Sequence, residues 1–163
     1  PDDAPRLQAL HARLSDESLQ FRFLGHRRTL PDEQAKYQAN IDFETTMALV
    51  ATIPDNDQER VVGVARYALI PSRKPKQAEA AIVVQDKYQR LGLGIMLSDR
   101  LVACAQSHRI YTFVSFIDPE NMGVVHLIRR CGLEYQVVGR DTESLEIQID
   151  ITPSKKSHGR DPN

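Results

Sequence analysis

The sequence lacks the features that mark several classes of protein. Its two cysteines, Cys104 and Cys131, are too few for a disulfide framework, so we expect both as reduced, packed thiols. Its five histidines show no metal-ligand spacing with one another or with the cysteines, so no metal site is predicted. The net charge of −1 creates no bulk field toward nucleic acid or an anionic membrane, and we expect neither as a partner.

Long apolar runs are also absent. No stretch approaches the length of a membrane span and no signal-peptide pattern occurs, so we expect a cytoplasmic protein. The 163 residues suffice for one compact domain with its own core. The first residue is Pro1 rather than methionine, which suggests a piece of a longer polypeptide or a processed chain.

Hydrophobic periodicity predicts three helices first and then mostly strands. Helical spacing begins near Asp3, a second helix begins after Ser15, and Pro31 opens a third that runs to Asn40. Strands are expected at 45–53, 60–70, 77–85, 110–117, 133–138 and 145–151, and further helices at 93–108 and 119–131. We expect Asp118 to cap the last helix and Gly132 to end it.

This order of elements predicts an α+β fold, with a mixed, mostly antiparallel sheet flanked by helices. The strand–helix–strand crossover over 77–117 predicts a parallel pair of strands. We expect the folded domain over residues 1–152 and a polar, disordered tail over residues 153–163.

The stretch Gln89-Arg-Leu-Gly-Leu-Gly94 joins a predicted strand to a predicted helix. A Walker loop needs four residues between its glycines, and a dinucleotide fingerprint needs a third glycine where Leu97 stands. A plain turn before a helix is a further alternative. An anion site is nevertheless favoured, because a helix start leaves N–H groups unpaired and carries about half a positive charge. Glycines would let a phosphate approach those donors, and Arg90 would add a charge.

The same stretch resembles the Q/R-x-x-G-x-G/A signature of the GCN5-related N-acetyltransferases, the GNAT superfamily. The surrounding order matches too: the strand AEAAIVV, a long helix, a strand, Asp118-Pro-Glu-Asn121, and a helix ending in CGLEY. The resemblance covers about 45–151 and implies the GNAT fold for the 1–152 domain, with the first strand of that fold missing from this chain. The segments AEAAIVVQDKYQRLGLG and PDDAPRLQALHARLSDESLQFRFLG further resemble Pat-type protein lysine acetyltransferases.

The resemblance implies an acetyl-CoA-dependent N-acetyltransferase that needs no metal. Coenzyme A is then expected along the end of a strand, at the glycine loop and at an asparagine. The residues at these positions are Ile82, Val83, Val84, Gln89, Arg90, Leu91, Gly92, Leu93, Gly94, Ile95 and Asn121. Asn121 has a local alternative, since an asparagine at a helix start can bond backbone.

Glu79 is the candidate general base. It shares a strand face with Ala81 and Val83, so we expect a partly desolvated carboxylate suited to accept a proton. A lysine amine is neutral in only about one molecule in 2,500 at pH 7, which corresponds to about 4.6 kcal/mol. A base is therefore needed, and the family likeness places a glutamate on this strand in that role. The alternative for Glu79 is a solvent-facing strand residue without function.

One residue typical of the family is missing. Seven positions after the asparagine, many members carry a tyrosine that protonates the leaving thiolate, but Ile128 stands here. A thiol with a pKa of about 8.5 is a fair leaving group, so we expect the thiolate to leave without that tyrosine. His126 lies two residues off the helical face of Ile128 and is a poor substitute.

The acceptor stays open at this level. The Pat likeness implies a protein lysine, for example in an acyl-CoA synthetase, and a regulatory domain fused outside this chain. A small-molecule amine as acceptor and a non-catalytic acyl-CoA sensor are the alternatives. The cluster His26-Arg27-Arg28 is expected as a loop, with the adenosine 3′-phosphate or an acidic protein surface as its possible contacts.

Overall fold

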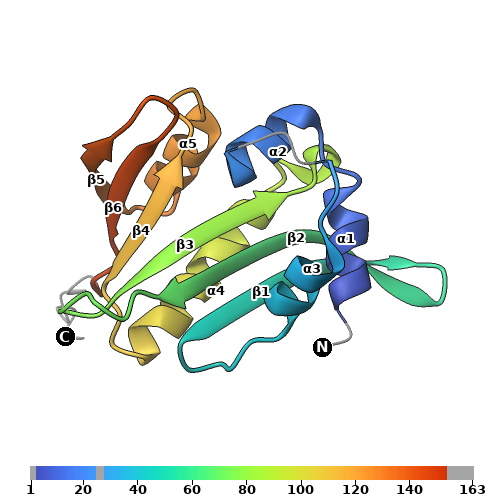
Figure 1. Cartoon of the computed structure of the whole chain (residues 1–163), viewed down its shortest axis with the longest axis horizontal. Coiled ribbons are helices and arrows are strands. Elements are labelled where there is room, and N and C mark those ends of the chain that lie inside the picture. The colour runs from blue at the N-terminus through green and yellow to red at the C-terminus, as the bar shows by residue number, and fades with distance from the viewer. Residues whose placement is uncertain (1–2, 25–27, 154–163) are drawn as a thin grey trace, which may run out of the picture.

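The computed structural model describes residues 3–24 and 28–153, which form one sheet with helices on both faces (Figure 1). The strand order is β1-β2-β3-β4-β6-β5. The strands are β1 (Thr46–Asp55), β2 (Gln58–Leu69), β3 (Gln77–Val84), β4 (Thr112–Ile117), β5 (Glu134–Arg140) and β6 (Leu145–Asp150). β3 pairs with β4 in parallel and the other neighbours pair antiparallel, so the predicted mixed, mostly antiparallel sheet is confirmed.

Three short helices lie on one face of the sheet. They are α1 (Ala4–His11), α2 (Asp16–Phe23) and α3 (Asp32–Ala39), close to their predicted positions. Ser15 caps α2 as predicted, because its Oγ accepts the Ser18 N–H at 3.1 Å. Apolar side chains of α1, α2 and the turn between them pack on β2 and β3. From the helical layer these are Leu10, Leu14, Leu19 and Phe23, and from the sheet Val61, Val64 and Val83.

The main core lies on the opposite face, under α4 (Leu93–Ser107) and α5 (Met122–Arg130). Leu97, Leu101 and Ala105 recur every four residues along α4 and are buried against the sheet. Ala78, Ala80 and Val84 of β3 face the same core, which confirms the alternation predicted for that strand.

The hairpin β1–β2 is longer than predicted. The strands continue to Asp55 and from Gln58, leaving Asn56 and Asp57 as the turn. Pro54 is tolerated in β1 because an edge strand does not need every N–H. Asn56 adopts the left-handed conformation with φ 55°, which asparagine accepts more readily than most residues.

The helix α5 is shorter than predicted. It begins at Met122 rather than at 119, and its cap is Asn121 rather than Asp118. The carboxylate of Asp118 instead accepts the Glu120 N–H at 2.8 Å, which closes a turn before the helix. Gly132, with φ 67°, follows its end as predicted.

Three further features concern the chain as a whole. Within the described residues, β1 is an edge strand with β2 as its neighbour. Cys104 and Cys131 are free thiols. No described helix is long and apolar enough to cross a membrane. The predicted tail beyond residue 153, and His26 and Arg27, lie outside the described residues.

Candidate functional site

The strands β3 and β4 pair only at their first residues. The register joins Gln77 to Thr112 and ends with Glu79 opposite Val114. Just beyond, Ser115 Oγ donates to the Ala80 carbonyl at 2.8 Å, and from there the two strands diverge, as Figure 1 shows. A V-shaped gap therefore opens in the sheet, with Glu79 at its base.

The edge of β3 that lines this gap has backbone groups to offer. Gln77 and Gln85 point theirs toward β2, since the Gln77 carbonyl accepts from Ile70 and the Gln85 N–H donates to Val62. Residues of the other parity, Ile82 and Val84, therefore point their backbone groups toward the gap, where the Val84 carbonyl already accepts from Gln89 Nε2. This edge can take an extended ligand as an added strand.

The loop from β3 to α4 contains two residues in the left-handed region, Arg90 with φ 61° and Gly92 with φ 88°. Gly92 suits this backbone conformation because side chains rarely adopt it, and space is not the reason, since a Cβ built there would meet nothing within 4 Å. Gly94 has a different reason: a Cβ there would lie 3.3 Å from Leu127 Cδ1, where α4 meets α5. The motif predicts that both glycines let a phosphate approach, whereas the structure gives Gly94 a packing contact.

The backbone N–H groups of residues 90–95 have no hydrogen-bond acceptor in the described chain. Hydrogen bonding within α4 starts only with Met96, whose N–H donates to the Gly92 carbonyl at 3.1 Å. The free donors lie at the N-terminus of a helix of 15 residues, which carries the positive end of its dipole. Such an arrangement is suited to hold phosphate groups.

Polar side chains fix this loop to the start of α2. The Asp86 carboxylate accepts the Ser15 N–H at 3.0 Å and the Ser18 hydroxyl at 2.8 Å. Burial raises the pKa of Asp86, but the hydrogen bonds from Ser15 and Ser18 outweigh it, so the net pKa is lowered. Gln89 Nε2 donates to Ser18 Oγ at 3.1 Å and to the Val84 carbonyl at 2.9 Å. The side chain of Gln89 thus holds the loop in place.

The helix α2 also reaches the far side of the gap. Gln20 Nε2 donates to Asp118 Oδ2, at the end of β4, over 3.3 Å. Because Ser18 contacts the loop after β3, α2 bridges the ends of the two diverging strands. It forms one wall of the gap.

Glu79 is exposed, so the partial desolvation predicted for it is wrong. Its face of the sheet stays open to solvent where β3 and β4 begin to separate. Its position at the base of the gap is the observation that keeps it a candidate base.

Two arginines that the sequence analysis did not single out lie near Glu79. Arg66 comes from β2, and Arg22 comes from α2 with its guanidinium carbon 4.8 Å from the centre of the Phe23 ring. Burial lowers the pKa of Arg22 to about 10; the charge of Arg66 lowers it too, and that of Glu79 raises it. Burial also lowers the pKa of Arg66, against opposing contributions from Tyr37 and Glu79. The sequence signal for these two residues is that each is an arginine with apolar neighbours: Arg22 lies between two phenylalanines and Arg66 lies within an apolar strand.

The residues at the start of α5 take local roles. Asn121 Oδ1 accepts the Val124 N–H at 3.1 Å, which is the backbone alternative predicted for it. Ile128 is buried in the main core, and His126 is exposed. Burial raises the pKa of the Cys131 thiol, which fits packing rather than nucleophilic chemistry.

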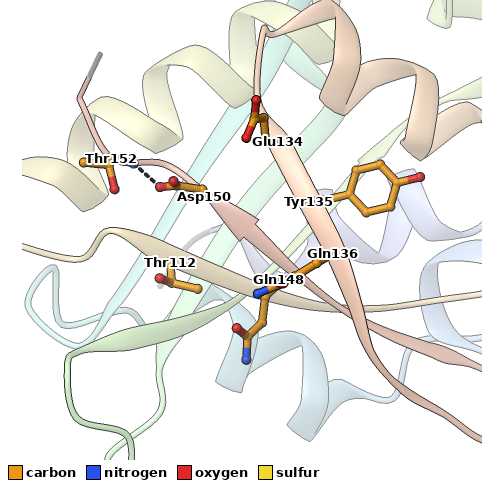
Figure 2. A pocket seen from close by; sticks show the side chains of 7 residues that line it. All are labelled: Thr112, Glu134, Tyr135, Gln136, Gln148, Asp150 and Thr152. Atoms are coloured by element: carbon orange, nitrogen blue, oxygen red, sulfur yellow. Dashed lines mark hydrogen bonds between the residues drawn. The ribbon is translucent and has the colours of Figure 1, made fainter. Parts of the chain in front are cut away.

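A shallow hollow of about 420 Å³ lies on the outer strands β4, β6 and β5 (Figure 2). It is lined by Thr112, Glu134, Tyr135, Gln136, Gln148, Asp150 and Thr152. The Tyr135 ring points away from the other side chains in Figure 2. Thr112 starts β4, at the end remote from the glycine loop, so the hollow is separate from the gap.

Comparison with known proteins decides the family. A model of the acetyltransferase (GNAT) family matches residues 12–133, most of the chain. The chain belongs to the GNAT acetyltransferase family. The resemblance seen in the sequence is thereby confirmed, together with the enzyme class and the acetyl-CoA cosubstrate of that family. Among the described residues, no cluster of three metal-ligating side chains occurs.

Individual relatives are found both among known sequences and among solved structures. An acetyltransferase of Pseudomonas aeruginosa is 32% identical over 105 residues, covering 64% of this GNAT chain and 55% of that protein, about half of its length. The GNAT domain of S. lividans PAT is 26% identical with a TM-score of 0.81, covering 91% of this chain and 85% of that one. A spermidine N-acetyltransferase from Vibrio cholerae, solved with CoA and spermine, shares the fold at 16% identity with a TM-score of 0.65, covering 91% and 89%.

Proposed function

We propose that this GNAT enzyme transfers the acetyl group of acetyl-CoA to a lysine side chain of a protein acceptor. The observation that carries the proposal is the gap between β3 and β4, with free N–H donors of residues 90–95 at one end and Glu79 at its base. A site for the donor's phosphates and a base thus lie along the same gap between the two strands. The protein acceptor rests on the likeness to the PAT domain and on the Pat-like segments of the sequence.

The donor is held mainly by backbone. The N–H groups of residues 91–95 bind the pyrophosphate, and each charge-assisted hydrogen bond contributes about 1.5–3 kcal/mol. Arg90 is exposed beside them and adds a positive charge. The β3 edge at residues 82–84 pairs with the pantetheine arm, which Asn121 approaches from the start of α5. Gln89 supports this site by fixing the loop to Ser18.

Glu79 removes the proton that blocks the acceptor. The acceptor arrives as an ammonium, passes a proton to the Glu79 carboxylate, and its nitrogen lone pair attacks the carbonyl carbon of the thioester. The new C–N bond forms, and the C–S bond then breaks to release the thiolate. After the attack the nitrogen still carries one surplus proton, which it gives to water, and the thiolate takes a proton from water because Ile128 has none to give. The Val84 N–H, which faces the gap, stabilises charge on the carbonyl oxygen.

The Glu79→Gln variant tests this assignment. We expect kcat to fall about 100- to 10,000-fold, with the KM for acetyl-CoA unchanged, because an amide cannot accept the proton. The measurement is thiol release at saturating acetyl-CoA with an acyl-CoA synthetase as acceptor, and mass spectrometry of acetyl-lysine. Glu59→Gln, an exposed glutamate of β2 away from the gap, is the matched control. An unchanged kcat excludes Glu79 as the base; wild-type enzyme that releases no thiol with any lysine acceptor excludes the protein substrate.

A small amine is the second candidate acceptor. The openness of the gap at Glu79 favours it, as does the fold shared with the spermidine N-acetyltransferase. The same assay with polyamines and amino acids separates the two, because a protein-directed enzyme should ignore free amines. The non-catalytic sensor predicted as an alternative would bind acetyl-CoA without thiol release, and family membership and the retained Glu79 argue against it.

Three expectations about the whole protein accompany this proposal. We place the catalytic domain at residues 1–152 with a tail after it, in a cytoplasmic protein, with a regulatory domain fused outside the chain. Limited proteolysis of the natural full-length protein and cell fractionation check them.

A further inference from the structure

We propose that Arg22 and Arg66 form an anion-binding subsite beside Glu79, which selects lysines that have an aspartate or glutamate next to them in the acceptor. The inference rests on the proposed function and adds a rule for the acceptor sequence. It concerns recognition of the acceptor and does not involve the proposed phosphate site at residues 90–95.

The sheet places Arg66 diagonally across from Glu79. Ala68 pairs with Glu79 and Arg66 pairs with Ala81, so Arg66 lies two residues along β2 on the same face as Glu79. This face is opposite to the main core, because Ala65 and Tyr67, the neighbours of Arg66, are buried in that core. The guanidinium therefore belongs to the face from which the gap opens at Glu79.

The helix α2 carries Arg22, and the charges of Arg66 and Glu79 both act on its guanidinium. Ser18 contacts the loop after β3, and Arg22 follows one helical turn later on the same side of α2. The flat side of Arg22 lies against Phe23, which limits its freedom. Arg22, Arg66 and Glu79 are close enough that the pKa of each arginine responds to the charge of Glu79.

The charges in this cluster do not balance. Glu79 is the one carboxylate that acts on both arginines, and within residues 3–24 and 28–153 neither arginine has an ion pair within 4.0 Å. One positive charge is left over. In the proposed reaction Glu79 also becomes neutral when it takes the proton, which leaves two. A second carboxylate, supplied by the acceptor, fits two partly buried guanidinium groups, because each can bind it through two parallel hydrogen bonds.

The test compares matched acceptors on the wild-type enzyme. Blocked pentapeptides Gly-Xaa-Lys-Yaa-Gly carry Asp or Glu at Xaa, at Yaa or at both, or the neutral Asn or Gln instead. We expect kcat/KM to be about ten- to a hundredfold higher for at least one acidic peptide than for its amide twin, mostly through KM. The difference should shrink as salt is added.

Equal kcat/KM for every acidic peptide and its twin would overturn the inference and leave the proposed function standing. No thiol release with any lysine acceptor would reject the proposed function, and this inference with it. Because the comparison needs no variant, it does not depend on whether an altered protein folds.

Variants then distinguish recognition from support of Glu79. Arg66→Gln is expected to raise KM for the acidic peptide to that of its amide twin, while KM for the amide twin stays the same. Arg66→Lys should restore only part of the preference for acidic peptides, because lysine keeps the charge but cannot make the two parallel hydrogen bonds of a guanidinium. Arg100→Gln, at an exposed position of α4, is the control. If Arg66→Gln instead lowers kcat equally for both peptides and leaves the ratio of their KM values unchanged, the arginines serve Glu79 and the inference is wrong.

Discussion

Two glycines of one motif, Gly92 and Gly94, meet different physical requirements. Gly92 adopts a backbone conformation that side chains disfavour, and Gly94 leaves room for Leu127 at 3.3 Å. A sequence motif records both as glycine and does not distinguish conformation from packing. The same holds for Arg22 and Arg66, which look like ordinary charged residues until the fold places them near Glu79.

Alanine substitutions separate the two glycines. Gly92→Ala strains the loop by about 1–2 kcal/mol, so we expect a weaker affinity for coenzyme A, measured by calorimetry. Gly94→Ala crowds Leu127, so we expect mainly a lower melting temperature, by a few degrees. Adding Leu127→Ala should relieve the crowding at Gly94→Ala and leave Gly92→Ala unchanged. Equal behaviour of both variants in both measurements would contradict these separate roles.

The helix α2 is the element that joins the parts of the site. Ser18 of α2 donates a hydrogen bond to Asp86 of the loop, and Gln20 donates one to Asp118 at the end of β4. The charge of Arg22 interacts with that of Glu79. The start of α2 depends on Ser15, which Asp86 also holds. A change at the start of α2 is therefore expected to affect both the proposed phosphate site at residues 90–95 and the surroundings of Glu79.

Asp86→Asn tests this coupling. The amide gives weaker hydrogen bonds to Ser15 and Ser18, so we expect a loss of about 1 kcal/mol in unfolding free energy and a higher Kd for coenzyme A. The folded state lowers the pKa of Asp86, so its contribution is present at neutral pH and is lost as the pH falls below the ordinary value of 3.8. Urea unfolding at pH 7 and pH 3 measures the change in stability and its pH dependence, and calorimetry measures the Kd. Asp57→Asn, in the exposed β1–β2 turn, is the control, and an equal loss for it would contradict the coupling.

The whole molecule has two layers of helices that differ in polarity. The α4–α5 face is a continuous apolar core, whereas the α1–α2 layer contains buried His11. Both ring nitrogens of His11 lack a hydrogen-bond partner among the described residues. Its ring packs edge to face with that of Phe23, with 4.9 Å between the ring centroids. Burial lowers the pKa of His11, and the charge of Arg22 lowers it further.

The free energy of unfolding of the whole protein should therefore decrease in mild acid. Since the folded state resists protonation of His11, stability is full above the ordinary pKa of 6.5 and falls as the pH drops below it. The slope is at most about 1.4 kcal/mol per pH unit. His11→Phe keeps the contact with Phe23 and should flatten the melting temperature between pH 7 and pH 5. A variant as pH-sensitive as wild type would assign the effect to another group.

The sequence by itself determined the order of elements, the apolar face of β3 and the glycine loop before α4, because these follow from periodicity and local backbone rules. The boundaries of α5 needed the structure, since Asp118 and Asn121 are both suitable caps and only geometry chooses between them. The exposure of Glu79 was mispredicted because neighbours along a strand say nothing about where the next strand diverges. Tertiary structure alone brought Arg22 and Arg66 near Glu79, since charges from three separate elements meet only once the sheet and α2 have packed.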